Sequence, residues 1–263
     1  WGMPVEFGGL VVETPQMLAG YIELSRPCLT TAFILTQRDA ACHRLANSPN
    51  ALIRQTLLPE HCSGQSLATV GISHLSTSRQ HWSRPSVAAT ETPDGYEITG
   101  EAPWVTGGRQ ADLLVTGATL ENGEQILAAV PTKRTGVVVG PALKLMALNE
   151  SYTGSVMLDR VQISREEIVL GPMPHVMKVG ATGGTGSFTT TAVAIGAATR
   201  TLQEFECEST SRPELADVIQ QLTDQLSMLR TDLMTAASTS MAADQLKTTA
   251  EDLRLRANSL VTR

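Results

Sequence analysis

The stretch "DGYEITGEAPWVTGGRQADLLVTGAT" (residues 94–119) decides the fold class of this chain. It opens on an Asp-Gly turn and continues through residues 96–105 with β-branched and aromatic residues, which favour strands. Two glycines at 107–108 break the run, and residues 111–120 resume it. The pattern predicts two strands separated by a turn, with Trp104 and Thr106 at the end of the first strand.

Trp104 has two interpretations, and tryptophans are informative here because aromatic residues make up only 4% of the chain. As a core residue, it would bury its ring at the strand end beside the turn. As a binding residue, it would offer a face to a flat ring system, with the Thr106 hydroxyl available to a ring nitrogen. These residues alone leave both interpretations open.

The strand pattern extends outward over residues 67–170, where turns such as "PDG", "ENGE" and "RTG" separate short β-branched segments. An all-β region is therefore expected there. Its strands are expected at residues 67–73, 86–91, 96–105, 111–120, 125–130, 136–140 and 154–163.

Apolar residues with helical spacing precede this region. A first helix is expected to begin at Thr14 and Pro15, and a second covers residues 28–46. A third is expected to follow Pro49, with Ser48 as its possible cap. The segment before the strands is therefore predicted to be helical.

Helical spacing returns after the strands. One helix is expected over residues 189–205, where Gly196 and small neighbours would allow close packing. A second begins at Pro213 and has the pattern of a bundle helix. Its inward face is expected to consist of Leu215, Val218, Ile219, Leu222, Leu226 and Leu229.

Composition limits the possible partners. The chain has 263 residues, 42% of them hydrophobic, and a net charge of −6, which argues against nucleic acid or an anionic membrane as the main partner. No apolar run approaches the ~20 residues of a membrane span. The four cysteines form no C-x-x-C pair, so neither a metal site nor a disulfide framework is expected, and a cytoplasmic location follows. Because the chain begins without Met and ends without a helix stop signal, it is expected to be a piece of a longer polypeptide.

Three segments resemble landmarks of the acyl-CoA dehydrogenase family: "PVEFGGL" (4–10), the stretch 94–119, and "SYTGSVMLDRVQI" (151–163). The resemblance covers the order of the whole chain and is most specific in residues 94–163. It implies an α+β multidomain fold with N-terminal helices (1–66), a middle β-barrel or sandwich domain (67–172) and an incomplete C-terminal helical bundle (173–263).

The resemblance also implies a flavin site, with FAD as the cofactor. In the family, the matching tryptophan packs on the flavin ring and the matching threonine forms a hydrogen bond with the flavin. The resemblance gives these roles to Trp104 and Thr106. A second family segment, usually "[LV]-T-E-P-x-A-G-S-D", corresponds to "GISHLSTSRQ" (71–80) here. Ser73 takes the place of its threonine and Thr77 or Ser78 that of its serine, while the acidic, proline and glycine positions have changed.

The family's reaction is α,β-dehydrogenation of an acyl thioester, carried by CoA or an acyl carrier, with electrons passed on to an acceptor. A glutamate takes the α-proton. One of its two family positions aligns with Gly186, and the other lies beyond Arg263. No catalytic residue is therefore assigned, and the resemblance further implies a homodimer or homotetramer.

A second hypothesis is a degenerate relative that binds an acyl thioester, or assembles, without catalysis. The intact "PWVT" favours the enzyme. The altered "ISHLSTSRQ" and the absence near Arg212 of the family motif "R-x-x-F-G" favour the degenerate relative, a non-catalytic module. His74 and His81 could touch a ligand, but structural roles are commoner. The glycines of residues 179–188 lack a Lys-Ser/Thr, so phosphate binding is not expected there.

Overall fold

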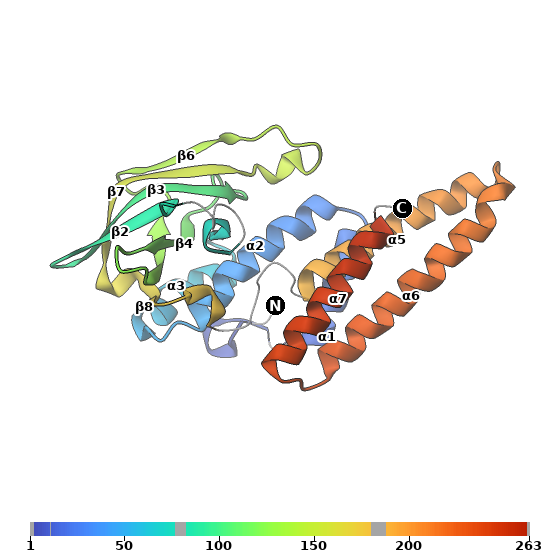
Figure 1. Cartoon of the computed structure of the whole chain (residues 1–263), viewed down its shortest axis with the longest axis horizontal. Helices are drawn as coiled ribbons and strands as arrows, with labels where there is room; N and C mark the ends of the chain where they lie inside the picture. Colours follow the sequence, from blue (N-terminus) through green and yellow to red (C-terminus); the bar gives the residue numbers. More distant parts are fainter. Residues whose placement is uncertain (1–2, 11, 77–82, 180–187, 262–263) are drawn as a thin grey trace. The chain divides into compact units, whose positions relative to one another are not determined.

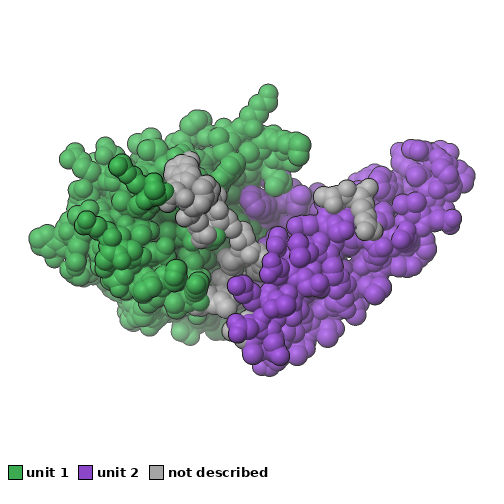
Figure 2. Space-filling view, viewed as in Figure 1, with its two compact units in different colours: residues 1–11, 34–182 green, residues 12–33, 183–263 purple. Residues whose placement is uncertain are grey.

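The chain divides into two compact units, each assembled from two segments (Figure 2). The computed structural model describes residues 3–10, 12–76, 83–179 and 188–261. Unit 1 comprises residues 1–11 and 34–182, and unit 2 comprises residues 12–33 and 183–263. Unit 1 thus combines residues 1–11 with the segment that contains the strands, and unit 2 combines residues 12–33 with the C-terminal helices.

The predicted order of helices, strands and helices is confirmed (Figure 1). The helices before the strands are η1 (Val5–Phe7), α1 (Thr14–Ser25), α2 (Leu29–Ala46) and α3 (Ala51–Ser63). The cap of α3 differs from the expectation: the Asn50 side chain accepts a hydrogen bond from the Leu52 amide at 3.1 Å. Ser48 instead donates to the Val169 carbonyl at 2.6 Å, which ties the start of α3 to the sheet.

Within the described residues of unit 1, eight strands form one mixed sheet. Their bounds are β1 (Ala68–Gly71), β2 (Val87–Thr92), β3 (Gly95–Val105), β4 (Leu113–Thr119), β5 (Gln125–Pro131), β6 (Val137–Ala142), β7 (Gly154–Ser164) and β8 (Ile168–Met173). Short helical elements interrupt them: α4 (Ser73–Ser76), η2 (Asn149–Ser151), η3 (Arg165–Glu167) and η4 (Val176–Lys178). Seven strands were predicted. The strand β8 was missed because the Gly171-Pro172 pair reads as a loop.

The sheet runs in the order β6-β7-β3-β2-β4-β5-β8, and β1 pairs in parallel with β4. Strand β4 is buried on both faces, since its consecutive side chains enter different cores. Leu113 and Val115 pack with residues of α2 and α3, whereas Leu114 packs with residues of β2, β3, β5 and β7. The sheet thus packs on itself on one side, as a sandwich does, and is covered by helices on the other.

Unit 2 is a helical bundle of α1 with α5 (Phe188–Ser209), α6 (Ala216–Ser238) and α7 (Ala243–Val261). The short η5 (Pro213–Leu215) precedes α6 and confirms the predicted helix start. Ile219, Leu226 and Leu229 are buried as expected, but Val218 is 51% exposed, so its inward assignment was wrong. Gly196 of α5 lies directly against α1, which confirms the predicted close packing.

None of the helices within the described ranges combines the length and the apolar character needed to cross a bilayer. In the same part of the chain, no three His, Cys, Asp or Glu side chains gather as metal ligands would.

A partly buried ion pair joins the β5–β6 turn to η3. The Arg134 guanidinium donates to both carboxylate oxygens of Glu167, one at 2.9 Å, and the Ser164 amide donates to the same carboxylate at 2.9 Å. Burial by itself would raise the pKa of Glu167, but the hydrogen bonds from Arg134 and Ser164 outweigh it, and the pKa lies below its usual value.

We expect Glu167→Gln to lower the free energy of unfolding at pH 7 by about 1–2 kcal/mol, because charge-assisted hydrogen bonds are lost at a site that solvent screens only in part. A lowered folded pKa gives stability that is complete above the unfolded pKa of about 4.3 and disappears as the pH falls through the folded value. The difference in urea unfolding between parent and variant should therefore be largest at pH 7 and shrink as the pH falls below the unfolded pKa of about 4.3. The neighbouring Glu166→Gln, at an exposed carboxylate, is the matched control.

Candidate functional site

Trp104 projects from the end of β3 into solvent. Its side chain is 51% exposed, whereas Ala102 and Val105 on the same strand are buried. The register between β3 and β7 shifts between Ala102 and Val105, and Trp104 has a φ of 59°. A bulky residue at positive φ costs about 1–2 kcal/mol. The core interpretation of Trp104 is therefore wrong, and a strained, exposed aromatic residue is typical of a binding site.

Thr106 lies two residues further on and is buried, with 3% of its surface exposed. Its hydroxyl is 2.9 Å from the Thr153 hydroxyl, which is 2.8 Å from the Ser151 hydroxyl. The backbone holds this row of three hydroxyls in place. The Thr69 hydroxyl donates to the Thr106 carbonyl at 2.7 Å, and the Gly107 amide donates to the Ser151 carbonyl at 2.9 Å.

Ser73 comes to the same end of β3 from the start of α4. Its hydroxyl donates to the Pro103 carbonyl at 3.0 Å, next to Trp104. The structure thus brings Ser73, Trp104 and Thr106 together within unit 1. Thr77, Ser78 and His81 lie outside the described residues. His74 is buried with Nε2 at 3.0 Å from the Gly117 carbonyl, which supports its structural interpretation.

Sequence reasoning missed three residues of this group. Ser151 and Thr153 supply the buried hydroxyls, and Tyr152 between them is 45% exposed with a φ of 50°. A hydrogen bond with Glu150 raises the pKa of the Tyr152 phenol. The segment "SYTG" was visible as a family landmark, but its contact with Thr106 depends on the pairing of Val105 with Gly154 across β3 and β7. That pairing is a long-range property without a local signal.

The chemistry of these groups suits a flat aromatic ligand that carries hydrogen-bond acceptors. An exposed indole offers a stacking face. The three hydroxyls carry three protons but share two hydrogen bonds, so one proton is left for a further acceptor. A flavin ring has both properties, and the residues present therefore fit its ring end.

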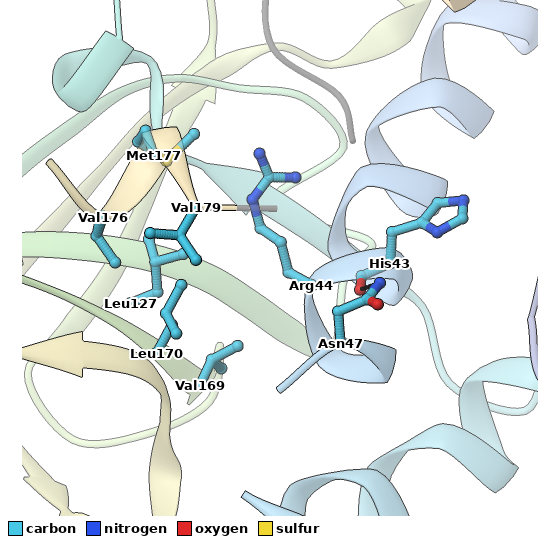
Figure 3. Close-up of a pocket in the computed structure, with 9 residues that line it drawn as sticks. All are labelled: His43, Arg44, Asn47, Leu127, Val169, Leu170, Val176, Met177 and Val179. Carbon is cyan, nitrogen blue, oxygen red and sulfur yellow. Dashed lines mark hydrogen bonds between the residues drawn. The ribbon is translucent and has the colours of Figure 1, made fainter. Parts of the chain in front are cut away.

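A separate pocket in unit 1 is lined by His43 and Arg44 of α2, by Asn47 just after that helix, and by the apolar residues Leu127, Val169, Leu170, Val176, Met177 and Val179 (Figure 3). The Arg44 side chain extends toward Val179, whereas the His43 ring points away from the apolar residues. Burial lowers the pKa of Arg44 to about 10 and also lowers the pKa of His43. The residues gathered at the end of β3 do not line this pocket: Ser73, Trp104, Thr106, Ser151, Tyr152 and Thr153.

Sequence comparison finds two distant relatives, and no family model matches. A probable acyl-CoA dehydrogenase of Bacillus subtilis (strain 168) is 26% identical over 117 residues, which are 44% of this chain and 20% of that protein. A probable FMNH2-dependent monooxygenase SfnC of Pseudomonas putida is 27% identical over 84 residues, 31% of this chain and 21% of that protein. The match spans about a fifth of the length of each of these curated relatives.

Structural comparison extends the likeness to nearly the whole chain. The glutaryl-coenzyme A dehydrogenase–glutaryl-CoA complex has a TM-score of 0.85 at 18% identity, over 98% of this chain and 70% of that one. FMN-bound TdsC from Paenibacillus sp. A11-2, a dibenzothiophene monooxygenase, has a TM-score of 0.82 at 19% identity, over 98% of this chain and 73% of that one. These values confirm the predicted α+β fold. The chain therefore has the fold shared by glutaryl-coenzyme A dehydrogenase and TdsC.

Proposed function

We propose that this protein is a flavin-dependent oxidoreductase. The observation that carries the proposal is the group at the end of β3, where an exposed and strained Trp104 stands beside a buried Thr106 hydroxyl. Trp104 would cover one face of the flavin ring and Thr106 would donate a hydrogen bond to it. The names of the relatives, a dehydrogenase and FMN- or FMNH2-linked monooxygenases, support a flavin as the cofactor.

The reaction that we propose first is α,β-dehydrogenation of an acyl thioester of CoA or an acyl carrier. When bound, the flavin would accept the hydride from the β-carbon. The protein would hold the substrate, orient the ring through Trp104 and Thr106, and provide a carboxylate for the α-proton. The dehydrogenation would need an electron acceptor as a partner. We propose a homodimer or homotetramer as the assembly, as in the family that the sequence resembles.

The second candidate is a flavin-dependent monooxygenase. It is favoured by Gly186, which stands where a dehydrogenase glutamate was expected, because a reaction without α-proton abstraction does not need that carboxylate. Gly186 itself lies outside the described residues.

FAD is the cofactor that we propose first. The altered segment 71–80, where pyrophosphate contacts were expected, makes FMN its competitor, since FMN lacks the pyrophosphate.

We expect the full-length protein to bind flavin and to show flavin absorbance, with one of two reactions following. If it is a dehydrogenase, acyl-CoA added without oxygen should bleach the oxidised flavin band. If it is a monooxygenase, acyl-CoA should leave the band unchanged, and reduced flavin with oxygen should oxygenate a heteroaromatic substrate. Flavin binding with neither reaction would favour the non-catalytic module, whereas failure to bind FAD and FMN would overturn the flavoprotein proposal.

A further inference from the structure

The three hydroxyls of the row that ends at Thr106 can donate to one another in only a few ways, which a count of their protons and hydrogen bonds identifies. Ser151, Thr153 and Thr106 each carry one hydroxyl proton, and two hydrogen bonds join their oxygens at 2.8 and 2.9 Å. Three arrangements satisfy both hydrogen bonds: the row donates from Ser151 toward Thr106, it donates in the reverse direction, or both ends donate to Thr153. The remaining proton then lies on Thr106, on Ser151 or on Thr153, respectively.

Burial and the available acceptors distinguish the three arrangements. Ser151 is 0% exposed, and among the described residues its hydroxyl has no partner besides Thr153. If the remaining proton lay on Ser151 or on Thr153, which is 6% exposed, it would be buried without an acceptor among the described residues, which costs about 1–3 kcal/mol. If the row points toward Thr106, the remaining proton lies on a residue that is itself only 3% exposed but stands two positions from the exposed Trp104. The direction toward Thr106 is therefore the stable one whenever a ligand acceptor lies beside Trp104.

We propose that Ser151 and Thr153 are positioning residues that make Thr106 a hydrogen-bond donor toward the bound ring. This inference rests on the proposed flavin site. Thr153 donates its hydroxyl proton to the Thr106 oxygen, so Thr106 directs its own proton to the ligand. Ser151 in turn keeps the Thr153 proton directed at Thr106. Neither residue touches the ligand in this arrangement; both act through Thr106.

The test compares flavin binding and the visible flavin spectrum in the full-length protein with FAD and FMN as probes. Thr153→Val keeps the shape of the side chain and removes its hydroxyl, and we expect flavin affinity to fall about 2- to 10-fold, the range for one neutral hydrogen bond. The flavin absorption band should shift as it does in Thr106→Val. The double variant Thr106→Val/Thr153→Val should lose no more than Thr106→Val alone, because the two residues act in series.

Three controls separate a positioning role from a loss of stability. Thr153→Ser restores the hydroxyl and should restore both affinity and spectrum. Ser151→Ala should shift affinity and spectrum in the same direction as Thr153→Val, by a smaller amount. Thr132→Val removes another buried threonine hydroxyl, which donates to the Ala111 carbonyl at 2.5 Å, and should leave flavin affinity and spectrum as in the parent.

Parent-like affinity and spectrum in Thr153→Val, or losses that add in the double variant, would overturn the positioning role while Trp104→Ala still weakens binding. If instead the parent binds no flavin, or Trp104→Ala and Thr106→Val both bind as the parent does, the proposed function fails. The two failures are therefore distinguishable. Should Thr153→Val not fold, parent-like binding by Ser151→Ala overturns the proposal on its own.

Discussion

Gly196→Ala is expected to destabilise the helical unit by roughly 3 kcal/mol, although alanine is the better helix former by about 1 kcal/mol. A Cβ at this position would lie 1.9 Å from the Ser25 hydroxyl and 2.3 Å from the Ile22 carbonyl oxygen of α1. Ile22 is fully buried and its carbonyl belongs to the helix backbone, so it cannot rotate away. Helices α1 and α5 would have to separate, and the contacts along both would weaken.

Thermal and urea unfolding of the full-length protein measure this effect. The variant Ser25→Ala/Gly196→Ala removes the hydroxyl clash but leaves the Ile22 carbonyl, so it should recover only part of the loss. Gly117→Ala is a useful comparison, since its closest neighbour would be the Leu75 Cδ1 atom at the tip of a side chain that can move. A smaller loss is expected there. A Gly196→Ala variant that unfolds at a higher temperature than the parent would show that the helix propensity of alanine outweighs the clash of its Cβ with α1.

Local patterns predicted the elements of this fold because local chemistry determines them. The β-branched runs between turn residues become β2 to β7, and Pro213 stands at the start of η5, immediately before α6. Errors occurred where two local signals competed. Ser48 and Asn50 are both good cap residues, and the contact of Ser48 with Val169 leaves Asn50 to cap α3. In β8, the Gly171-Pro172 pair concealed a short strand that pairing with β5 stabilises.

The candidate site was predictable only in part, for a related reason. Trp104, Thr106 and Ser73 could be named from the family resemblance, and the structure places Ser73 against the carbonyl of Pro103. The hydroxyl row could not be predicted, because Thr106 and Thr153 meet only through the pairing of β3 with β7. The exposure of Trp104 was also beyond sequence reasoning, since the bulge between Ala102 and Val105 determines where the side chain points.

Trp104 should show opposite effects on ligand binding and on stability. Its half-exposed indole contributes little to the core, and its φ of 59° suits glycine better than tryptophan. We therefore expect Trp104→Gly to leave the ligand-free protein at least as stable as the parent, with a gain of up to about 1–2 kcal/mol from relief of the positive φ. Trp104→Ala should change stability much less than the ~3–5 kcal/mol that truncation of a buried tryptophan costs.

Flavin affinity should respond in the other direction. Loss of the stacking face removes about 0.5–1.5 kcal/mol beyond area burial, and the uncovered apolar area adds about 1–2 kcal/mol. Trp104→Ala and Trp104→Gly should thus weaken flavin binding roughly 10- to 300-fold in a fluorescence titration, while Trp104→Phe keeps a stacking face and loses less. Unchanged affinity in all three variants would remove Trp104 from the site. A strained aromatic residue whose removal stabilises the fold and impairs binding has no structural reason to be there, so the combined result would tie the strain at the end of β3 to the ligand.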